Sequence, residues 1–302
     1  MGRCPPEGLS PPPISKKGPM RIRRLKKSEI PEVKRLCESA HWPYTLKDVE
    51  RLYRLGPNGW FCAIVDGRFA GQAMGLKIET LGCIGIVIVR GDLQRRGIAT
   101  ALTEAALTYL LDQGIKTVKL DATAEGYGIY EKLKFVPEYS VLHYVRDASL
   151  SPPSGDEPAG IEALRSADIT LLARMDKRYY GVDRSTVLKA LAKDSEGFVL
   201  SDKKKIRGYA MTRPMDYENG LWLGPWVAED VFSAEALLKH ILSRSQGKEI
   251  RLGALEANLR NQDLLAQYGF KVDFKITRMC YGRPMKRGNP LGIYAEAGHE
   301  KG

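Results

Sequence analysis

The chain repeats itself once, and this repeat limits what it can fold into more than any other feature. Short landmarks return in the same order at a spacing of 135 to 139 positions. A fixed period over several landmarks indicates two copies of one folding unit. The landmark pairs are Ser28–Pro31 with Ala167–Thr170, Trp60–Phe61 with Gly197–Phe198, Gly71 with Gly208, Gly85 with Gly224, and Lys134–Phe135 with Gly269–Phe270.

Composition marks where the two copies begin and end. Residues 148–159 are rich in proline and serine and lack apolar periodicity, which is typical of a linker. We predict a disordered lead over 1–19, a first unit over 20–147, the linker, a second unit over 160–283, and a loosely ordered tail over 284–302. The proline-rich lead has no apolar region of the kind found in a secretory signal.

Periodicity in the first copy predicts a mixed sheet flanked by helices. Ile84–Val89 is an unbroken β-branched run, typical of a strand buried on both faces. Apolar residues from Ile98 onward recur at helical spacing and predict a long helix. The other predicted elements are strands at Arg21–Leu25, Trp60–Val65, Phe69–Lys77 and Val118–Asp121, strands near Val136 and Leu142, and helices from Ser28, at Leu46–Leu55 and up to Leu133.

Charge and cysteine usage narrow the class of protein. The net charge of +11 favours an anionic partner without choosing one, since nucleic acid, an acidic surface and a phosphate-rich cofactor all qualify, and an ordinary basic surface explains it equally well. The five scattered cysteines predict neither a disulfide framework nor a zinc site, and suit a reducing cytoplasm. No apolar run approaches the length of a membrane span.

A basic, glycine-containing loop precedes the predicted long helix. The segment Gln94–Thr100 reads QRRGIAT. A helix N-terminus carries unpaired amides and the positive end of the helix dipole, so it attracts phosphate. Gly97 removes a Cβ that would obstruct the approach, and Arg95 and Arg96 add positive charge. Taken alone, such a loop is weak support for a phosphate site.

The segment QRRGIA after a hydrophobic strand resembles the Q/R-x-x-G-x-G/A signature of the GNAT (GCN5-related N-acetyltransferase) superfamily. The opening MRIR (Met20–Arg23) and IYEKLKF (Ile129–Phe135) resemble that family as well. The longer pattern resembles a branch with two tandem GNAT units, on the segments LDAT (Leu120–Thr123), GVDRS (Gly181–Ser185), LGPWVAED (Leu223–Asp230) and ITRMCYG (Ile276–Gly282). The resemblance implies an α/β (α+β) fold of two units, each a mixed, mostly antiparallel sheet flanked by helices.

The resemblance also implies a cosubstrate, acetyl-CoA, and residues that bind it. The central strand would line the pantetheine arm through Val87, Ile88 and Val89, with a backbone N–H polarising the thioester carbonyl. The loop would hold the pyrophosphate through Arg95, Arg96, Gly97, Ile98, Ala99 and Thr100. Tyr130 matches the tyrosine that protonates the departing CoA thiolate, although a half-buried packing role would also explain it.

Three positions depart from the family pattern. Lys134 replaces a glycine, and Thr123 stands where an asparagine is common. No carboxylate lies on the central strand, so Asp121, or less directly Glu79, is the candidate for a general base, unless the amine arrives already deprotonated.

The second copy lacks the phosphate loop. Counting from Gly224, the segment falls at Ser233–Leu238, which has no glycine or arginine and contains a carboxylate. Leu265 takes the tyrosine position. We therefore expect one active site per chain, a second unit that helps form the acceptor site, and CoA binding that residues 20–147 retain alone.

The predicted function is transfer of an acyl group, most simply acetyl, from CoA to an amine of a small molecule, in a direct ternary complex without a metal. Trp42 and Tyr44 between the first two helices are candidate acceptor contacts, together with Trp226 of the second half. Trp222 and Tyr179–Tyr180 are further possible contributions, and each of these aromatics could instead be core or interface packing. The acceptor stays open among amino acids, amino sugars, polyamines, aminoglycosides and protein amines, and the oligomeric state is not predicted. A non-catalytic acyl-CoA sensor is the alternative, and a nucleic-acid-binding protein has less support.

Overall fold

The strands and helices of the first half form where apolar periodicity places them. The computed structural model describes residues 20–155, 158–203, 205–285, 288–298 and 300, so the predicted lead lies outside the described residues. Its first-half elements are β1 (Met20–Arg24), α1 (Ile30–Ser39), α2 (Leu46–Leu55), β2 (Trp60–Val65), β3 (Arg68–Ile78), β4 (Leu81–Val89), α3 (Ile98–Asp112), β5 (Thr117–Ala122), α4 (Ala124–Lys132) and β6 (Val136–Arg146).

Two local features show how well the periodicity specifies these elements. The turn Asp66–Gly67 has φ 50° and 74°, the left-handed backbone that a tight hairpin requires. The prediction of two separate strands near Val136 and Leu142 is wrong, because the single strand β6 runs through both positions.

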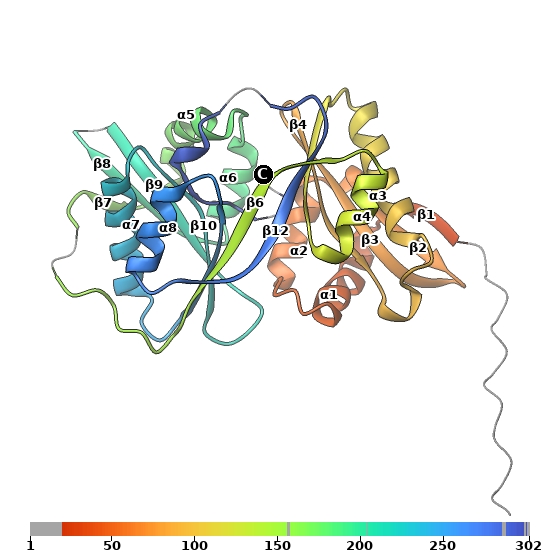
Figure 1. Cartoon of the computed structure of the whole chain (residues 1–302), viewed down its shortest axis with the longest axis horizontal. Helices are drawn as coiled ribbons and strands as arrows, with labels where there is room; N and C mark the ends of the chain where they lie inside the picture. Colours follow the sequence, from red (N-terminus) through yellow and green to blue (C-terminus); the bar gives the residue numbers. More distant parts are fainter. Residues whose placement is uncertain (1–19, 156–157, 204, 286–287, 299, 301–302) are drawn as a thin grey trace, which may run out of the picture.

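The second half repeats the order of elements. The prediction of two α/β copies is confirmed by this order (Figure 1). The elements are β7 (Ile161–Ala163), α5 (Ile169–Tyr180), α6 (Ser185–Ala192), β8 (Glu196–Asp202), β9 (Lys205–Pro214), β10 (Gly220–Ala228), α7 (Val231–Arg244), β11 (Glu249–Leu255), α8 (Leu259–Gln267), β12 (Lys271–Gly282) and β13 (Ile293–Ala295).

The halves exchange a strand. All described strands belong to one sheet in the order β1-β2-β3-β4-β5-β12-β6-β11-β10-β9-β8-β7, with β13 on β10. Strand β12 of the second half pairs with β5, and β6 of the first half pairs with β11. The long strands β6 and β12 cross the middle of the molecule side by side (Figure 1). The two units are therefore interlocked rather than merely packed together.

The described part of the tail is ordered, so the prediction of a loosely ordered tail is wrong for these residues. Ile293, Tyr294, Ala295 and Ala297 are buried, and β13 pairs with β10 antiparallel. The apolar run Ile293–Ala295 stabilises this segment by burial, although the rest of the tail is rich in glycines and charged residues.

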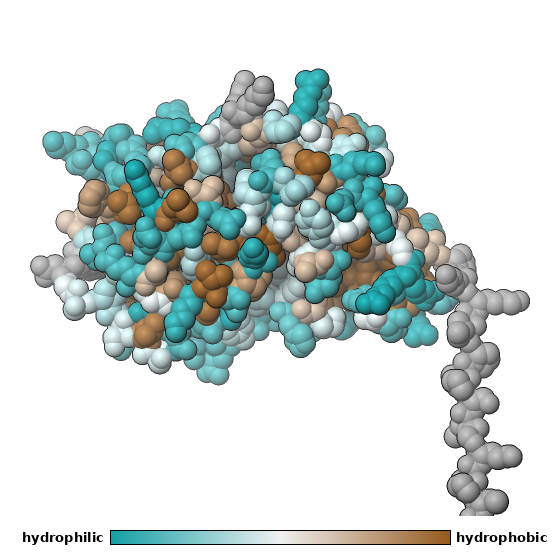
Figure 2. All heavy atoms as spheres, in the orientation of Figure 1, coloured by the Kyte–Doolittle hydropathy of each residue, from teal (hydrophilic) through white to brown (hydrophobic). Residues whose placement is uncertain are grey.

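Helices cover the sheet in separate cores. Helices α1, α2, α5 and α6 share one continuous core that spans both halves. Helices α3 and α4 pack into a separate core that includes Met279 of β12, and α7 and α8 pack into another that includes Leu142 and Tyr144 of β6. On the face shown in Figure 2, polar residues dominate and apolar residues form small separated spots. No described helix is long and apolar enough to cross a membrane.

Candidate active site

The central strand β4 and its neighbour β5 part halfway along their length. They pair in parallel from Leu81–Ile84 against Thr117–Leu120, and β4 then continues to Val89 without β5. A bulge lies just past this point, where Ile86 has φ 50° and the register with β3 shifts. A bulge leaves backbone groups outside the regular ladder. The strand thus presents backbone of Ile86 and Val87 to the space between the diverging strands.

The loop before α3 has the properties that a phosphate site needs. Gln94, Arg95, Arg96 and Gly97 are exposed. Gly97 is the N-cap of α3 with φ 80°, and no described side chain caps the helix. The amides of the first turn, Ile98–Thr100, are therefore available to an anion.

The second half lacks this loop. Eight residues (90–97) separate β4 from α3, but only Glu229 and Asp230 separate β10 from α7. The segment Ser233–Leu238, where the phosphate loop was expected, lies within α7 instead. Asp230 accepts a hydrogen bond from the Ser233 amide at 2.8 Å, so the helix N-terminus already holds a carboxylate.

The corresponding strands of the second half, β10 and β11, also diverge, but the chain itself fills the space between them. Strands β10 and β11 pair only from Gly220–Trp222 against Glu249–Arg251, and β13 lies against β10 beyond that point. Trp226, predicted as an acceptor contact, is fully buried there with its ring centroid 5.1 Å from that of Tyr294. That prediction is wrong, because Trp226 packs in the core of the second half.

A cavity of about 500 Å³ lies where the two halves meet, and it includes the bulge of β4. The first half contributes Trp42 and Tyr44 of the α1–α2 loop, together with Val87 and Tyr130. Ile88 and Val89 lie outside the lining and pair with β3. The second half contributes Trp222, a candidate from the sequence. The second half and β6 also contribute residues that the sequence did not point to: His143, Arg213, Tyr217, Glu249, Arg251 and Phe274.

Tyr130 lines this cavity from α4 and is 8% exposed. Burial raises the pKa of its phenol to about 12, and the Asp121 carboxylate adds to the rise. Its ring meets Phe135 edge-on at 6.2 Å, which fixes its orientation. Tyr130 is therefore held protonated at the cavity wall throughout the neutral range.

Asp121 also lines the cavity, but its carboxylate is bound by a partner from the exchanged strand. Arg278 of β12 donates two hydrogen bonds to it, one of them at 2.8 Å, and bridges to Glu296 at 2.7 Å. All three side chains are at most 5% exposed. A carboxylate neutralised by a bidentate guanidinium is a poor proton acceptor. Glu79 pairs instead with Lys177 at 2.6 Å and is not a lining residue.

The two units define an acetyltransferase fold of the GNAT type, and comparison of sequences agrees. Residues 28–135 match the profile described as acetyltransferase (GNAT) family, and residues 172–295 match that of an acetyltransferase (GNAT) domain. Together the matches span more than half of the chain, one in each half. The chain belongs to the GNAT family, in the branch with tandem GNAT domains.

Solved structures share this fold. A protein from Pyrococcus horikoshii, provisionally described as an acetyltransferase, superposes with a TM-score of 0.80 at 22% identity, over 98% of this chain and 100% of that one. A tandem GNAT protein from the clavulanic acid biosynthesis pathway has a TM-score of 0.65 at 12% identity, over 89% of this chain and 100% of that one. A GCN5-related N-acetyltransferase from Sphaerobacter thermophilus has a TM-score of 0.64 at 17% identity, over 89% of this chain and 98% of that one. A comparison with curated protein sequences finds no match.

Proposed function

We propose that the chain is an N-acyltransferase that moves an acyl group, most simply acetyl, from CoA to an amine of a small molecule. One observation carries the proposal. A single cavity contains the bulge of β4, the phenol of Tyr130 and side chains of both halves. A thioester next to the bulge and an amine among the second-half residues would share this space.

The residues of the first half fit CoA, and those of the second half do not. The pyrophosphate would meet the exposed amides and arginines of Arg95–Thr100, while the pantetheine arm would follow β4 past Val87. The bound thioester supplies an activated acyl carbon. Backbone N–H groups of the bulge would stabilise negative charge on the carbonyl oxygen, and Tyr130 would donate a proton to the leaving sulfur. In the second half, Asp230 and β13 fill the corresponding positions.

Direct transfer is favoured because the described lining residues lack an available thiol, aliphatic hydroxyl or amine of the kind that commonly carries an acyl group. They include no cysteine, serine or lysine, and Thr123 caps α4 by accepting from the Gly126 amide. The described cysteines are buried, and burial raises the thiol pKa of Cys83 to about 12. An amine held in the cavity would therefore attack the acyl carbon itself, within a ternary complex.

The test is release of CoA thiol from acetyl-CoA with a panel of small amines, with each product identified by mass spectrometry. We expect amine-dependent release, and initial-rate lines that intersect when both substrates are varied. Parallel lines would indicate an acyl-enzyme and contradict direct transfer. CoA binding without amine-dependent release would favour the sensor.

A further inference from the structure

Flat aromatic surfaces from both halves dominate the acceptor end of the cavity. The rings of His143 and Phe274 stack at 4.2 Å with 4° between their planes, and Trp222 lies 6.0 Å from His143. Phe274 keeps 46% of its surface exposed although it lines the cavity. Trp42 faces the cavity from the first half. These surfaces suit a flat apolar group, which stacks on rings and gains from leaving water.

The charged side chains of the described lining already have partners within the protein. Glu249 pairs with Arg251 at 2.7 Å and accepts from Tyr217 at 2.6 Å. Arg251 also pairs with Asp273 at 2.6 Å. Arg213 donates to the carbonyls of Gly224 and Ala297, Asp48 pairs with Arg51, and Asp121 pairs with Arg278. A ligand with several positive charges would have to break such pairs to find partners, at a large cost in desolvation.

We infer that the acceptor is a primary amine with one positive charge, carried on a flat aromatic or similarly apolar body. This inference rests on the proposed function and names its substrate class. The apolar body would lie against Phe274 and Trp222, and the amine would point to the bulge of β4. Polyamines and aminoglycosides are excluded as preferred acceptors by the same charge balance.

Two measurements separate this inference from the proposed function. Calorimetry with the free protein compares 2-phenylethylamine, 2-cyclohexylethylamine, n-butylamine and spermidine, and thiol release gives kcat/KM for each. We expect 2-phenylethylamine to bind most tightly and to exceed n-butylamine and spermidine in kcat/KM by about 10-fold or more. Phe274→Ala should weaken 2-phenylethylamine binding about 10-fold and leave n-butylamine unaffected. Phe232→Ala, at an exposed ring on α7 outside the cavity, is the matched control.

Preference for spermidine, or equal binding of 2-phenylethylamine and n-butylamine, overturns the inference. Selective aromatic binding without any thiol release supports the site but contradicts the acyltransferase function.

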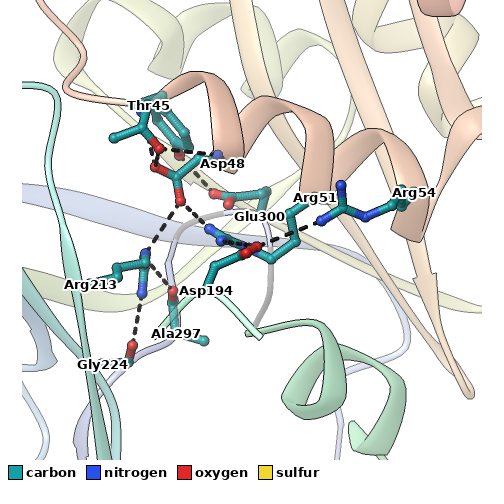
Figure 3. A network of polar contacts seen from close by, with 10 residues as sticks. Thr45, Asp48, Arg51, Arg54, Asp194, Arg213, Gly224, Ala297 and Glu300 are labelled. Atoms are coloured by element: carbon teal, nitrogen blue, oxygen red, sulfur yellow. Dashed lines mark hydrogen bonds and ion pairs between the residues drawn. The ribbon is translucent and has the colours of Figure 1, made fainter. Parts of the chain in front are cut away.

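The tail supplies an independent second observation. It leaves β13, passes Ala297, and brings Glu300 back to the first half. Tyr44 donates a hydrogen bond to Glu300 at 2.8 Å, and Glu300 is fully buried. A Cβ on Gly85 would lie 2.4 Å from the Glu300 Cβ, so the tail touches β4 beside the bulge. Figure 3 shows Glu300 among side chains of α2 and near Arg213 of β9.

Glu300 lies at a buried cluster of charged side chains. Arg51 and Arg213 are buried cations, and Asp48 contacts both, the second at 3.5 Å. Asp194 reaches Arg51 at 3.2 Å from the half-buried edge of the cluster. Glu300 adds a fully buried carboxylate beside these side chains (Figure 3), and it accepts the hydrogen bond from Tyr44. The tail is thereby fixed to the loop that carries Trp42 and Tyr44.

We propose that Glu300 is a positioning residue for the acceptor wall. By accepting from Tyr44 it holds the α1–α2 loop against the cavity, so its loss should impair amine binding before it impairs CoA binding. The matched variants are Glu300→Ala, which removes the acceptor atom, Glu300→Gln, which keeps an oxygen in its place, and Tyr44→Phe, which removes the donor.

The measurements are the KM for amine, the KM for acetyl-CoA, kcat, and the melting temperature. We expect Glu300→Ala and Tyr44→Phe each to raise the KM for amine about 10-fold, with no further increase when combined, and Glu300→Gln to retain most of the affinity. The KM for acetyl-CoA should change less than 2-fold. Glu32→Ala, which removes an exposed pair with Arg35 on α1, is the control. An unchanged KM for amine would overturn the positioning role. So would a rise in both KM values together with a fall in melting temperature.

Discussion

At the scale of single residues, Tyr130 shows how burial sets a chemical role. A pKa of about 12 keeps the phenol protonated, which a proton donor needs. A free thiol has a pKa of about 8.5, so donation from this phenol to an exposed thiolate would be uphill. Burial in the same cavity raises the proton affinity of the thiolate as well, which reduces the mismatch.

Replacing Tyr130 with Phe keeps the packing against Phe135 and removes only the proton donor. We expect turnover to fall by roughly 100-fold, within the usual range for general acid catalysis. CoA affinity by calorimetry should stay nearly unchanged. Ionisation of Tyr130 should not lower the wild-type rate below about pH 10, because the phenol has a raised pKa of about 12 and stays protonated there. Wild-type turnover in the variant would leave Tyr130 a packing residue.

Lys134 occupies a backbone conformation that suits glycine, the residue that the family pattern has there. Its φ is 68°, and the corresponding Gly269 of the second half has 81°. We expect Lys134→Gly to raise the free energy of unfolding by about 0.5–1 kcal/mol, since relief of left-handed strain exceeds the added chain entropy. Urea titration measures the change. Lys132→Gly, at the last residue of α4, should instead lower the free energy of unfolding, by less than the ~1 kcal/mol that glycine costs in a helix interior.

At the scale of elements, the same strand–loop–helix unit has two fates. The N-terminus of α3 is uncapped by described side chains and follows an exposed basic loop, whereas that of α7 carries Asp230 as its cap. Glu229 beside it binds Arg178, Lys205 and Arg207 within 3.3 Å. An anion would therefore find open amides at the start of α3, whereas Asp230 already occupies the start of α7.

Calorimetry should give one CoA per chain, and Gly97→Glu should weaken binding by more than 100-fold. The substitution places a negative charge and a side chain at the amides that hold the pyrophosphate. Gly114→Glu is the matched control, because Gly114 has φ 77° and open space around its Cβ, like Gly97, but lies beyond the other end of α3. Two CoA per chain, or equal losses in both variants, would contradict the assignment of the halves.

At the scale of the whole molecule, the strand exchange changes what a single half can do. The sequence predicts that residues 20–147 bind CoA alone, because the loop is local. In the structure, β5 pairs with β12 of the second half, and Arg278 of β12 neutralises Asp121. A half without its partner exposes a sheet edge and leaves a buried carboxylate unpaired.

We therefore expect residues 20–147 and 148–302 to be unfolded or aggregated when expressed separately, and to co-purify as a CoA-binding complex when expressed together. Full-length protein should unfold in one calorimetric transition whose van't Hoff and calorimetric enthalpies agree. Circular dichroism checks the separate halves. A folded first half that binds CoA at full affinity would show that β6 can replace β12 beside β5.

The sequence by itself determined the repeat, most elements of each copy, and the residues local to one element boundary. Gly97 and its neighbours could be predicted because a loop, a strand end and a helix start are set by adjacent residues. Only the tertiary structure decided which strands pair across the halves, because the residue patterns of β6 and β12 do not specify which of the two lies beside β5. It alone brought Phe274 and Glu300 to a cavity with Tyr130, since the contacts that place them, with His143 and Tyr44, join residues more than a hundred positions apart, where no local periodicity applies.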